Sequence, residues 1–484
     1  MSATRVVVRD THRGPDGDNF GAIVLAGASL AMESGALLNN PSTGLGVSDP
    51  GSRASLKSCV VQGTWWAGDR ALGAAVLAGA SLLWEDGALH SNQGGALLVE
   101  GAGSEAQVSR TSVVGFAQAA AQGVSSGFTV RNGARLEVRE TAVVRTRAYG
   151  MSALGAGSLL EVTGLLLREN RAMDDVSVGL AVAGGAHLAL DESALAGNQG
   201  YGLVLEEGGE AVVARTIIRD TSVGRPLLNA GVLVGPNSKL QLSRSSLVAN
   251  SGIGMRVSGP AAAVDASELV IRGTQAGSAG GGEALSVSAS RLDLTQAQLL
   301  QNHRVAAYLN VDSEVSLTNV IVRATLADGS NESGIGVVCN SVVKASVRSS
   351  AFVDNRVAGL YVWGPGPVTV SDSLFLKVAP DQETHVGSGL VLARAATATI
   401  ERTEIDSCPS GVILDAASAT LAGSLLRRNA VALHAQGGTV IREVSSSAEG
   451  ARELELAVDT QTVFFENGSV VGNGQVPLPA PPLF

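Results

Sequence analysis

The sequence predicts an all-β protein, a right-handed single-stranded parallel β-helix of about 17 turns. Apolar residues recur with a period of two in short stretches along the chain, which indicates strands rather than helices. The turns alternate between about 23 and about 29 residues, enough for three short strands each. The 60 glycines and the 3% aromatic content suit many strands joined by tight turns. Right-handed coiling follows the general preference for right-handed crossovers.

The repeat is clearest in Leu180–Thr221, which contains two consecutive turns. In the first turn, apolar residues and a serine precede Asn198 at fixed offsets, and the second turn repeats the pattern before Thr221. We interpret the equivalent asparagines as structural rather than ligand-binding. An asparagine tolerates the dihedral angles of a tight bend, and stacked amides can bond to neighbouring turns. The equivalent positions are Thr11, Asn40, Thr64, Asn92, Phe116, Thr146, Asn170, Asn198, Thr221, Asn250, Thr274, Asn302, Thr325, Asn355, Val378, Cys408 and Asn429.

The two outer faces of the coil differ in polarity. In the first strand of each turn, the residues expected to point outward are mostly apolar, whereas those of the second strand are polar. The first set is Ile23, Leu97, Val204, Leu233, Tyr308, Tyr361, Val391 and Ile413. The second set is Arg135, Glu137, Arg139, His187, Asp191, Lys239, Gln241, Arg291 and Asp293. An apolar stripe of this length exceeds what a monomer usually exposes.

Inserts in alternate turns offer a cover for the apolar stripe. They follow the repeat position and emerge on one edge, and we expect them to fold over this face, with a partner surface as the second alternative. The inserts are Thr64–Gly73, Phe116–Gly127, Asn170–Gly179, Thr221–Gly231, Thr274–Gly282, Thr325–Gly334 and Val378–Gly389.

The ends of the chain depart from the repeat. Val6–Thr11 matches the last part of a turn, so we expect upstream turns or a capping domain in a longer protein. Residues 1–433 are predicted to form the β-helix, and residues 434–484 a last turn, a cap and a proline-rich tail. Within that cap, Leu454–Val458 alternates like a strand, and Phe464 and Phe465 are expected to plug the core.

Composition excludes several function classes. A net charge of −10 without clustered cations argues against nucleic-acid binding. No apolar run reaches the roughly 18 residues that span a bilayer, so no membrane insertion is expected. Cys59, Cys339 and Cys408 form no recognisable disulfide or metal-binding pattern. No cofactor or metal site is predicted, because the six histidines are scattered; each is expected at the surface or in a turn.

These repeats resemble the right-handed parallel β-helix proteins of the pectate-lyase-like superfamily over about residues 6–433. The resemblance rests on strands of the pattern Gly-hydrophobic-x-hydrophobic, a small residue five positions before the repeat position, and the asparagine series. It implies an extracellular or cell-surface rod for adhesion, glycan binding or structural display. The alternative that it implies is a polysaccharide lyase or glycoside hydrolase acting on an acidic polysaccharide.

The motifs of the catalytic members are incomplete here. Asn310-Val-Asp312 and Asp174-Asp175 occur in the reverse of the hydrolase order, and His-Gly and Arg-x-Lys do not occur. Asp16-Gly-Asp18-Asn19 resembles part of a calcium loop but lacks the distal ligands, which favours an acidic turn. The sequence therefore favours a non-catalytic protein and leaves enzymatic activity open.

Aromatic residues near the insert edge are the candidate contacts for a ligand or partner. Trp65 and Trp66 stand side by side in an insert, where packing over the apolar sheet is favoured over stacking on a sugar. Tyr201, Tyr308, Tyr361 and Trp363 lie near the same edge. The partner they would serve is a polysaccharide or a cell-surface protein.

Overall fold

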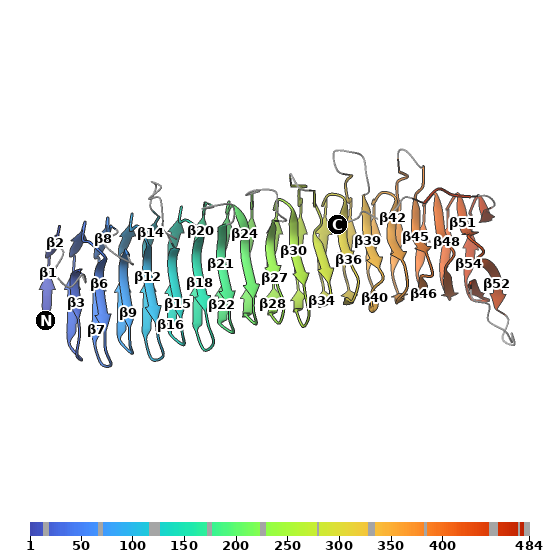
Figure 1. The fold of residues 1–484 in the computed structure, drawn as a ribbon. Coiled ribbons are helices and arrows are strands. Elements are labelled where there is room, and N and C mark those ends of the chain that lie inside the picture. The colour runs from blue at the N-terminus through green and yellow to red at the C-terminus, as the bar shows by residue number, and fades with distance from the viewer. Residues whose placement is uncertain are drawn as a thin grey trace. The chain divides into compact units, whose positions relative to one another are not determined.

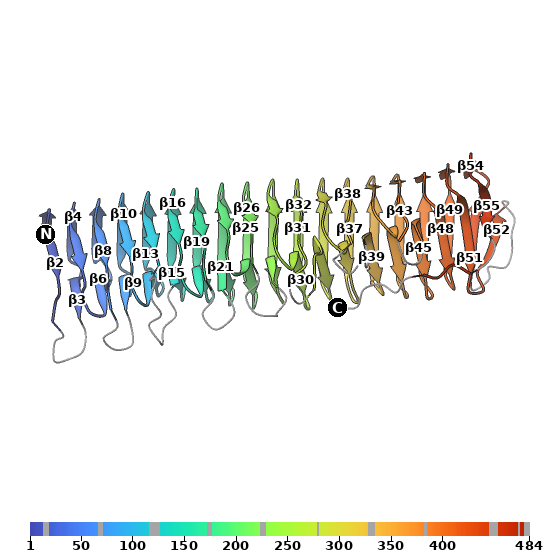
Figure 2. The same ribbon diagram turned by 90° about the horizontal axis from the view of Figure 1, so that it is seen from above.

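The computed structural model confirms the all-β class. It describes residues 1–12, 19–65, 71–115, 126–171, 177–222, 229–277, 280–327, 334–381, 385–444, 454–472 and 475–478. All regular elements in these ranges are strands, and the chain divides into two compact units, Met1–Gln241 and Leu242–Phe484. Within each unit every third strand lies side by side with the next, so each coil contributes one strand to each of three sheets (Figures 1 and 2).

Sheet A is the second strand of each coil. In the first unit it contains β1 (Ser2–Thr4), β4 (Ser29–Glu33), β7 (Arg53–Lys57), β10 (Ser81–Glu85), β13 (Glu105–Ser109), β16 (Arg135–Arg139), β19 (Leu159–Thr163), β22 (His187–Asp191) and β25 (Glu210–Ala214). The unit boundary falls within β28 (Lys239–Ser243). In the second unit sheet A contains β31 (Ala263–Ser267), β34 (Arg291–Thr295), β37 (Glu314–Thr318), β40 (Lys344–Arg348), β43 (Pro367–Ser371), β46 (Thr397–Glu401), β49 (Ser418–Ala422), β53 (Glu455–Asp459) and β52 (Val440–Val444).

Sheet B is the third and shortest strand of each coil. In the first unit it contains β2 (Val7–Arg9), β5 (Ala36–Leu38), β8 (Val60–Gln62), β11 (Ala88–His90), β14 (Ser112–Val114), β17 (Ala142–Val144), β20 (Leu166–Arg168), β23 (Ala194–Ala196) and β26 (Ile217–Arg219). In the second it contains β29 (Ser246–Val248), β32 (Val270–Arg272), β35 (Gln298–Leu300), β38 (Ile321–Arg323), β41 (Ala351–Val353), β44 (Leu374–Leu376), β47 (Glu404–Asp406), β50 (Leu425–Arg427) and β54 (Val463–Phe465).

Sheet C is the first strand of each coil. In the first unit it contains β3 (Phe20–Val24), β6 (Thr43–Ser48), β9 (Leu72–Leu77), β12 (Gly95–Glu100), β15 (Ser126–Arg131), β18 (Tyr149–Leu154), β21 (Ser177–Ala183), β24 (Gly200–Glu206) and β27 (Ala230–Val234). In the second it contains β30 (Ile253–Ser258), β33 (Leu285–Ser288), β36 (Val305–Leu309), β39 (Ile335–Asn340), β42 (Ala358–Trp363), β45 (Ser388–Ala393), β48 (Ser410–Asp415), β51 (Val431–Gln436) and β55 (Ser469–Gly472).

The core of each unit is a set of stacked side-chain columns. The strands pair in parallel, and equivalent residues of successive coils lie opposite one another. Ala74, Leu97 and Phe128 form one such buried column in sheet C of the first unit. In the second unit Phe352 stacks on Phe375, with ring centroids 4.6 Å apart. Stacking in register lets one apolar pattern, repeated per coil, fill the whole core.

Buried polar side chains form hydrogen bonds between successive coils at the corner between sheets B and C. Ala324 there has a φ of 54°, which takes the next N–H group out of the strand ladder. The Thr325 N–H donates to Asn355 Oδ1, 30 residues later, at 3.1 Å, and the Thr325 hydroxyl donates to the same atom at 2.8 Å. Asn355 Nδ2 in turn donates to the Val322 carbonyl at 3.2 Å. The bonds therefore run from the asparagine side chain to the backbone of the preceding coil.

The same kind of contact recurs in both units. The further donors and acceptor asparagines are Thr11 with Asn40, Thr64 with Asn92, Thr146 with Asn170, Asn170 with Asn198, Thr274 with Asn302, and Cys408 with Asn429. The left-handed residue at each bend was expected to be the asparagine itself, which is wrong. It is the residue before it, such as Asp354 (φ 55°) before Asn355, because the asparagine already follows the bend and points inward.

Glycines at the start of the sheet C strands make room for these asparagines. A Cβ atom on Gly150 would lie 2.3 Å from Asn170 Nδ2, and one on Gly179 would lie 3.0 Å from Asn198 Nδ2. Neither glycine has a positive φ, so the requirement is for space rather than for backbone freedom. The Gly-hydrophobic-x-hydrophobic pattern of the sequence is thus the counterpart of the asparagine series.

The polar outer face of sheet A agrees with the sequence pattern. Arg135 pairs with Glu161 on the neighbouring strand at 2.7 Å. Lys239 and His187 both approach Glu210, at 3.0 and 3.5 Å. These side chains are between 36% and 66% exposed. Exposed pairs of this kind contribute little to stability and chiefly keep the face solvated.

The apolar outer face of sheet C is largely buried. Val204, Tyr308, Tyr361, Val391 and Ile413 are at most 7% exposed, whereas Ile23 is 46% exposed. The inserts that were predicted to fold over this face consist mainly of residues that lie outside the described ranges. In the second unit, Val476 and Leu478 of the C-terminal segment pack against the cluster that contains Tyr308, Tyr361 and Ile413.

The assignment of Leu97 to the outer face was wrong. Leu97 lies in the core column, and its neighbour Leu98 points outward. Residues 96–99 are apolar at every position. Hydropathy alone therefore could not decide which alternate residues of this strand face the core. The register of strand pairing decides it.

The C-terminal coil contains one rearrangement. The predicted strand at Leu454–Val458 is present as β53, but β52 lies beyond it, so the order in sheet A is β49, β53, β52. Phe464 is half-buried, whereas Phe465 is 52% exposed and is not a core plug, because strand alternation turns it outward. The division into 1–433 and 434–484 stays a prediction.

Two further observations concern single residue types. Trp84 is fully buried, and all three cysteines are buried free thiols. Burial raises the pKa of Cys339 to about 12, which keeps this thiol protonated and unreactive. Among the described residues, none forms a helix long and apolar enough to cross a membrane.

Replacing Asn355 by alanine tests the contribution of the corner bonds. The change leaves the buried Thr325 N–H without its acceptor, and an unsatisfied buried group costs about 1–3 kcal/mol. We expect the free energy of unfolding, measured by denaturant titration, to fall by about that amount. The exposed Gln298, replaced by alanine as a control, should change it by less than about 0.5 kcal/mol. Equal effects of the two substitutions would contradict the assigned role.

Candidate functional site

A column of hydroxyl side chains crosses the outer face of sheet A in the second unit. Ser316, Ser346, Thr369, Thr399 and Thr420 lie opposite one another on five successive strands, β37, β40, β43, β46 and β49. Threonine is well suited to a pleated, half-exposed surface. Adjacent strands are about 4.8 Å apart, so the column presents one hydroxyl per strand at a regular spacing.

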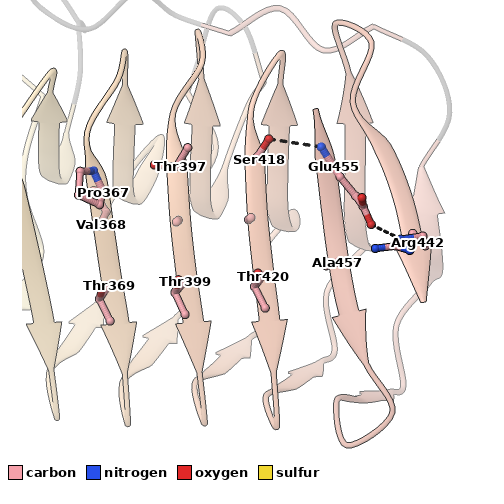
Figure 3. A pocket seen from close by; sticks show the side chains of 12 residues that line it. Pro367, Val368, Thr369, Thr397, Thr399, Ser418, Thr420, Arg442, Glu455 and Ala457 are labelled. Carbon is pink, nitrogen blue, oxygen red and sulfur yellow. Dashed lines mark hydrogen bonds and ion pairs between the residues drawn. The ribbon is translucent and has the colours of Figure 1, made fainter. Parts of the chain in front are cut away.

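A second, shorter column runs beside the first. Pro367, Thr397 and Ser418 stand two residues earlier on the last three of these strands and point to the same side. The residues between the two columns, Ala398 and Ala419, face the core and are buried. Figure 3 shows the two columns side by side as the floor of a groove.

The groove is closed at one end by the rearranged C-terminal strands. Glu455 of β53 donates its N–H to Ser418 Oγ at 3.4 Å and pairs with Arg442 of β52 (Figure 3). The groove has a volume of about 350 Å³. Arg442 and Glu455 are the charged groups among its lining residues, and each neutralises the other. The remaining lining is hydroxyl, methyl and proline ring.

This lining suits a neutral, hydroxyl-rich ligand. A serine or threonine hydroxyl can both donate and accept a hydrogen bond, as a sugar hydroxyl can. The threonine methyl groups and the Pro367 ring add apolar contact area. Sequence reasoning missed this surface, although Pro367-Val-Thr369, Thr397-Ala-Thr399 and Ser418-Ala-Thr420 repeat at the coil period.

The predicted aromatic contacts do not gather in one place. Trp65 is 44% exposed and donates its indole N–H to the Asn39 carbonyl at 3.2 Å. Trp66 lies outside the described residues. Tyr201 packs, partly buried, against the small cluster of Val178, Ala181 and Val204.

The other three aromatic candidates belong to one cluster on sheet C of the second unit. Tyr308 and Tyr361 are buried, and Trp363 packs on Tyr361 edge to face, with ring centroids 5.8 Å apart. The Arg394 guanidinium lies 4.2 Å from the Trp363 ring centroid. Burial raises the pKa of Tyr361. Of these three rings, only Trp363 offers appreciable surface to a ligand.

A buried carboxylate lies elsewhere in the second unit. Glu283 has no exposed side-chain area, and Arg304 Nη1 is 3.8 Å from its Oε1, beyond hydrogen-bond distance. Desolvation by burial raises the pKa of Glu283 to about 7, against the opposing effect of Arg304 and Arg256. A single carboxylate with no access to solvent does not form the converging, open constellation that polysaccharide cleavage requires.

The remaining sequence motifs form no site. Asn310 accepts a hydrogen bond from Asn340 at 2.9 Å, and Asp312 is an exposed turn residue. Asp174-Asp175 and Asp16-Gly-Asp18 lie outside the described ranges. Within those ranges no three His, Cys, Asp or Glu side chains come together as metal ligands would. His434, expected at the surface or in a turn, is buried on β51, because it continues the covered outer column of sheet C beside Ile413.

Comparisons with known proteins agree with this architecture. A family model described as right handed beta helix region matches residues 120–276. A search of curated proteins found no match. The strand order, the three parallel sheets and the family match define the chain as a right-handed parallel β-helix repeat protein.

Solved structures similar to the chain include two epimerases and a phage tailspike protein. A double mutant of the periplasmic alginate epimerase AlgG is 9% identical, with 93% of this chain and 78% of that chain covered and a TM-score of 0.30. The A-module of the Azotobacter vinelandii mannuronan C-5 epimerase AlgE4 is 10% identical, with 82% and 89% covered and a TM-score of 0.26. Bacteriophage CBA120 tailspike protein 3 is 8% identical, with 93% and 57% covered and a TM-score of 0.26. Likeness at this level gives no basis for transferring an activity.

Replacing Glu283 by glutamine tests the burial of this carboxylate. Its pKa in the folded chain, about 7, lies above the ordinary value of 4.5. The folded chain therefore holds the proton over this range while the unfolded chain releases it, and stability falls as the pH rises from about 4.5 to about 7. We expect the substitution to remove this slope and to raise stability at pH 8 by up to roughly 3 kcal/mol.

The free energy of unfolding, measured by denaturant titration at several pH values, checks this expectation. The exposed Glu314, replaced by glutamine, serves as the matched control and should leave the slope in place. An unchanged slope in the Glu283 variant would show that this carboxyl group is not the source.

Proposed function

We propose that the protein is a non-catalytic β-helical scaffold that binds a glycan in the hydroxyl-lined groove of sheet A. The observation that carries the proposal is the pair of in-register columns, Ser316 to Thr420 and Pro367 to Ser418. A glycan chain crossing the strands would meet one hydroxyl of the longer column on each strand, and a pair of hydroxyls on β46 and on β49. The cost of ordering the site is small, because the strands that present these side chains are already paired on both sides.

The charge of the groove favours a neutral glycan over an acidic one. The one cationic lining residue, Arg442, is engaged by Glu455. A polyuronide would require cations that are free to meet its carboxylates. The binding surface we propose therefore differs from the acidic-polysaccharide site of the enzymatic alternative.

The absence of paired catalytic groups in the described groove supports the non-catalytic role. Hydrolysis needs two carboxyl groups facing each other across the bond that breaks. The groove lining contains one, Glu455, whose side chain is 9% exposed and held by Arg442. Adhesion or structural display at the cell surface, with a polysaccharide or a cell-surface protein as partner, is the setting we propose for such a scaffold.

Replacing Thr399 and Thr420 together by valine tests the groove. The change removes two hydroxyls and keeps the shape and strand preference of the side chains. Each lost hydrogen bond costs about 0.5–1.5 kcal/mol, so affinity for the best-bound neutral oligosaccharide should fall about 5- to 150-fold.

Isothermal titration calorimetry with neutral and uronic-acid oligosaccharides provides the measurement. The control is valine at Thr163, an exposed threonine on sheet A of the first unit, which should bind as the parent chain does. Binding of uronic-acid oligosaccharides alone would contradict the proposed ligand class. Release of new chain ends from a polyuronide would overturn the non-catalytic role.

A further inference from the structure

The C-terminal segment lies on the outer face of sheet C in the second unit. Val476 and Leu478 pack against the apolar cluster formed by Tyr361, Val391, Ile413 and their neighbours. Exposure alternates along the segment: Gln475 and Pro477 are exposed, whereas Val476 and Leu478 are half-buried. This is the pattern of an extended chain that presents every second side chain to a surface.

One side chain of the sheet binds the backbone of this segment. Gln436, at the end of β51, accepts the Val476 N–H through Oε1 at 2.7 Å. Its Nε2 donates to the Val476 carbonyl at 3.0 Å. Gln436 is only 8% exposed. A buried amide that satisfies both main-chain groups of one residue fixes the position and direction of the segment along the face.

The composition of the segment suits an apolar surface. Pro477 has no N–H group, so a donor that would otherwise need a partner on this face is missing. Proline also restricts the free chain to extended conformations, which lowers the entropy lost on docking. Surfaces that recognise proline-rich segments present aromatic and branched apolar side chains. The outer face of sheet C presents such side chains, together with one polar group that bonds to the backbone of the segment.

We infer that the outer face of sheet C around β42, β45 and β48 is a recognition surface for an extended proline-rich segment, and that the chain's own Gln475–Leu478 is its occupant. Gln436 is the residue that sets the register. Covalent attachment gives the tail a high effective concentration, so a free peptide of the same sequence competes poorly with it. The surface becomes open to such a peptide only when the tail is released. This inference is independent of the proposed glycan groove, which lies on sheet A.

The full-length chain with Val476→Asp and Leu478→Asp tests the inference, because both substitutions place a charge against the apolar face and release the tail. A fluorescent peptide with the sequence of residues 475–484 should bind this variant at least about 10-fold more tightly than it binds the parent chain, by fluorescence anisotropy. Adding Gln436→Ala should then weaken peptide binding about 5- to 150-fold, as expected for the loss of two hydrogen bonds. The exposed Gln475, replaced by aspartate, should leave the parent behaviour unchanged.

Two outcomes overturn the inference: no peptide binding by the released-tail variant, or equally tight binding by the parent chain. A second measurement covers the case in which the double variant does not fold. In the full chain carrying Gln436→Ala alone, limited proteolysis should remove the tail at least about five-fold faster than in the parent chain. Equal cleavage rates would show that Gln436 does not hold the segment.

Discussion

The structure depends on how the backbone N–H groups at the corners of each coil find acceptors. Among the described residues, a residue with a positive φ follows every short sheet B strand except β14, and it turns the next N–H group away from the ladder, into the interior. At Thr325 and Thr274 the acceptor is the side chain of Asn355 or Asn302 in the next coil. An unpaired buried donor is costly, so the coils that carry an asparagine at this point gain stability from it, and a glycine such as Gly150 or Gly179 leaves room for its side chain. The repeat follows from this requirement as much as from the hydrophobic pattern.

Because these hydrogen bonds lie inside the coil, the side chains on the outer faces of the sheets can differ in polarity. Sheet A carries charged pairs such as Arg135 with Glu161 in the first unit, and the hydroxyl columns around Thr399 in the second. Sheet C carries apolar side chains that are covered, in the second unit by Val476 and Leu478 among others. A parallel β-helix can present a regular array on one face because strand spacing is constant and side chains two residues apart share a face. The proposed groove and the proposed tail surface use different faces of one scaffold.

The candidate site was the part least accessible to prediction. Aromatic residues drew attention because single large side chains dominate many binding surfaces, yet Tyr308 and Tyr361 are buried in a cluster. The threonines of the groove have no individual signal, since each Thr-x-Thr or Ser-x-Thr stretch also reads as an ordinary exposed strand. Their meaning comes from register: Thr369, Thr399 and Thr420 lie far apart in the sequence and become one column only when the strands pair.

The sequence by itself determined the fold class and the positions of the corner asparagines, because these follow from local alternation and a recurring spacing. Tertiary structure decided that Leu97 faces the core and Leu98 faces outward within a uniformly apolar run. It also decided the order of β53 before β52 and the hydrogen bonding of the C-terminal segment to Gln436. Each of these depends on which strand pairs with which, and at what register. A one-residue shift would exchange the inner and outer faces without changing the composition of any strand.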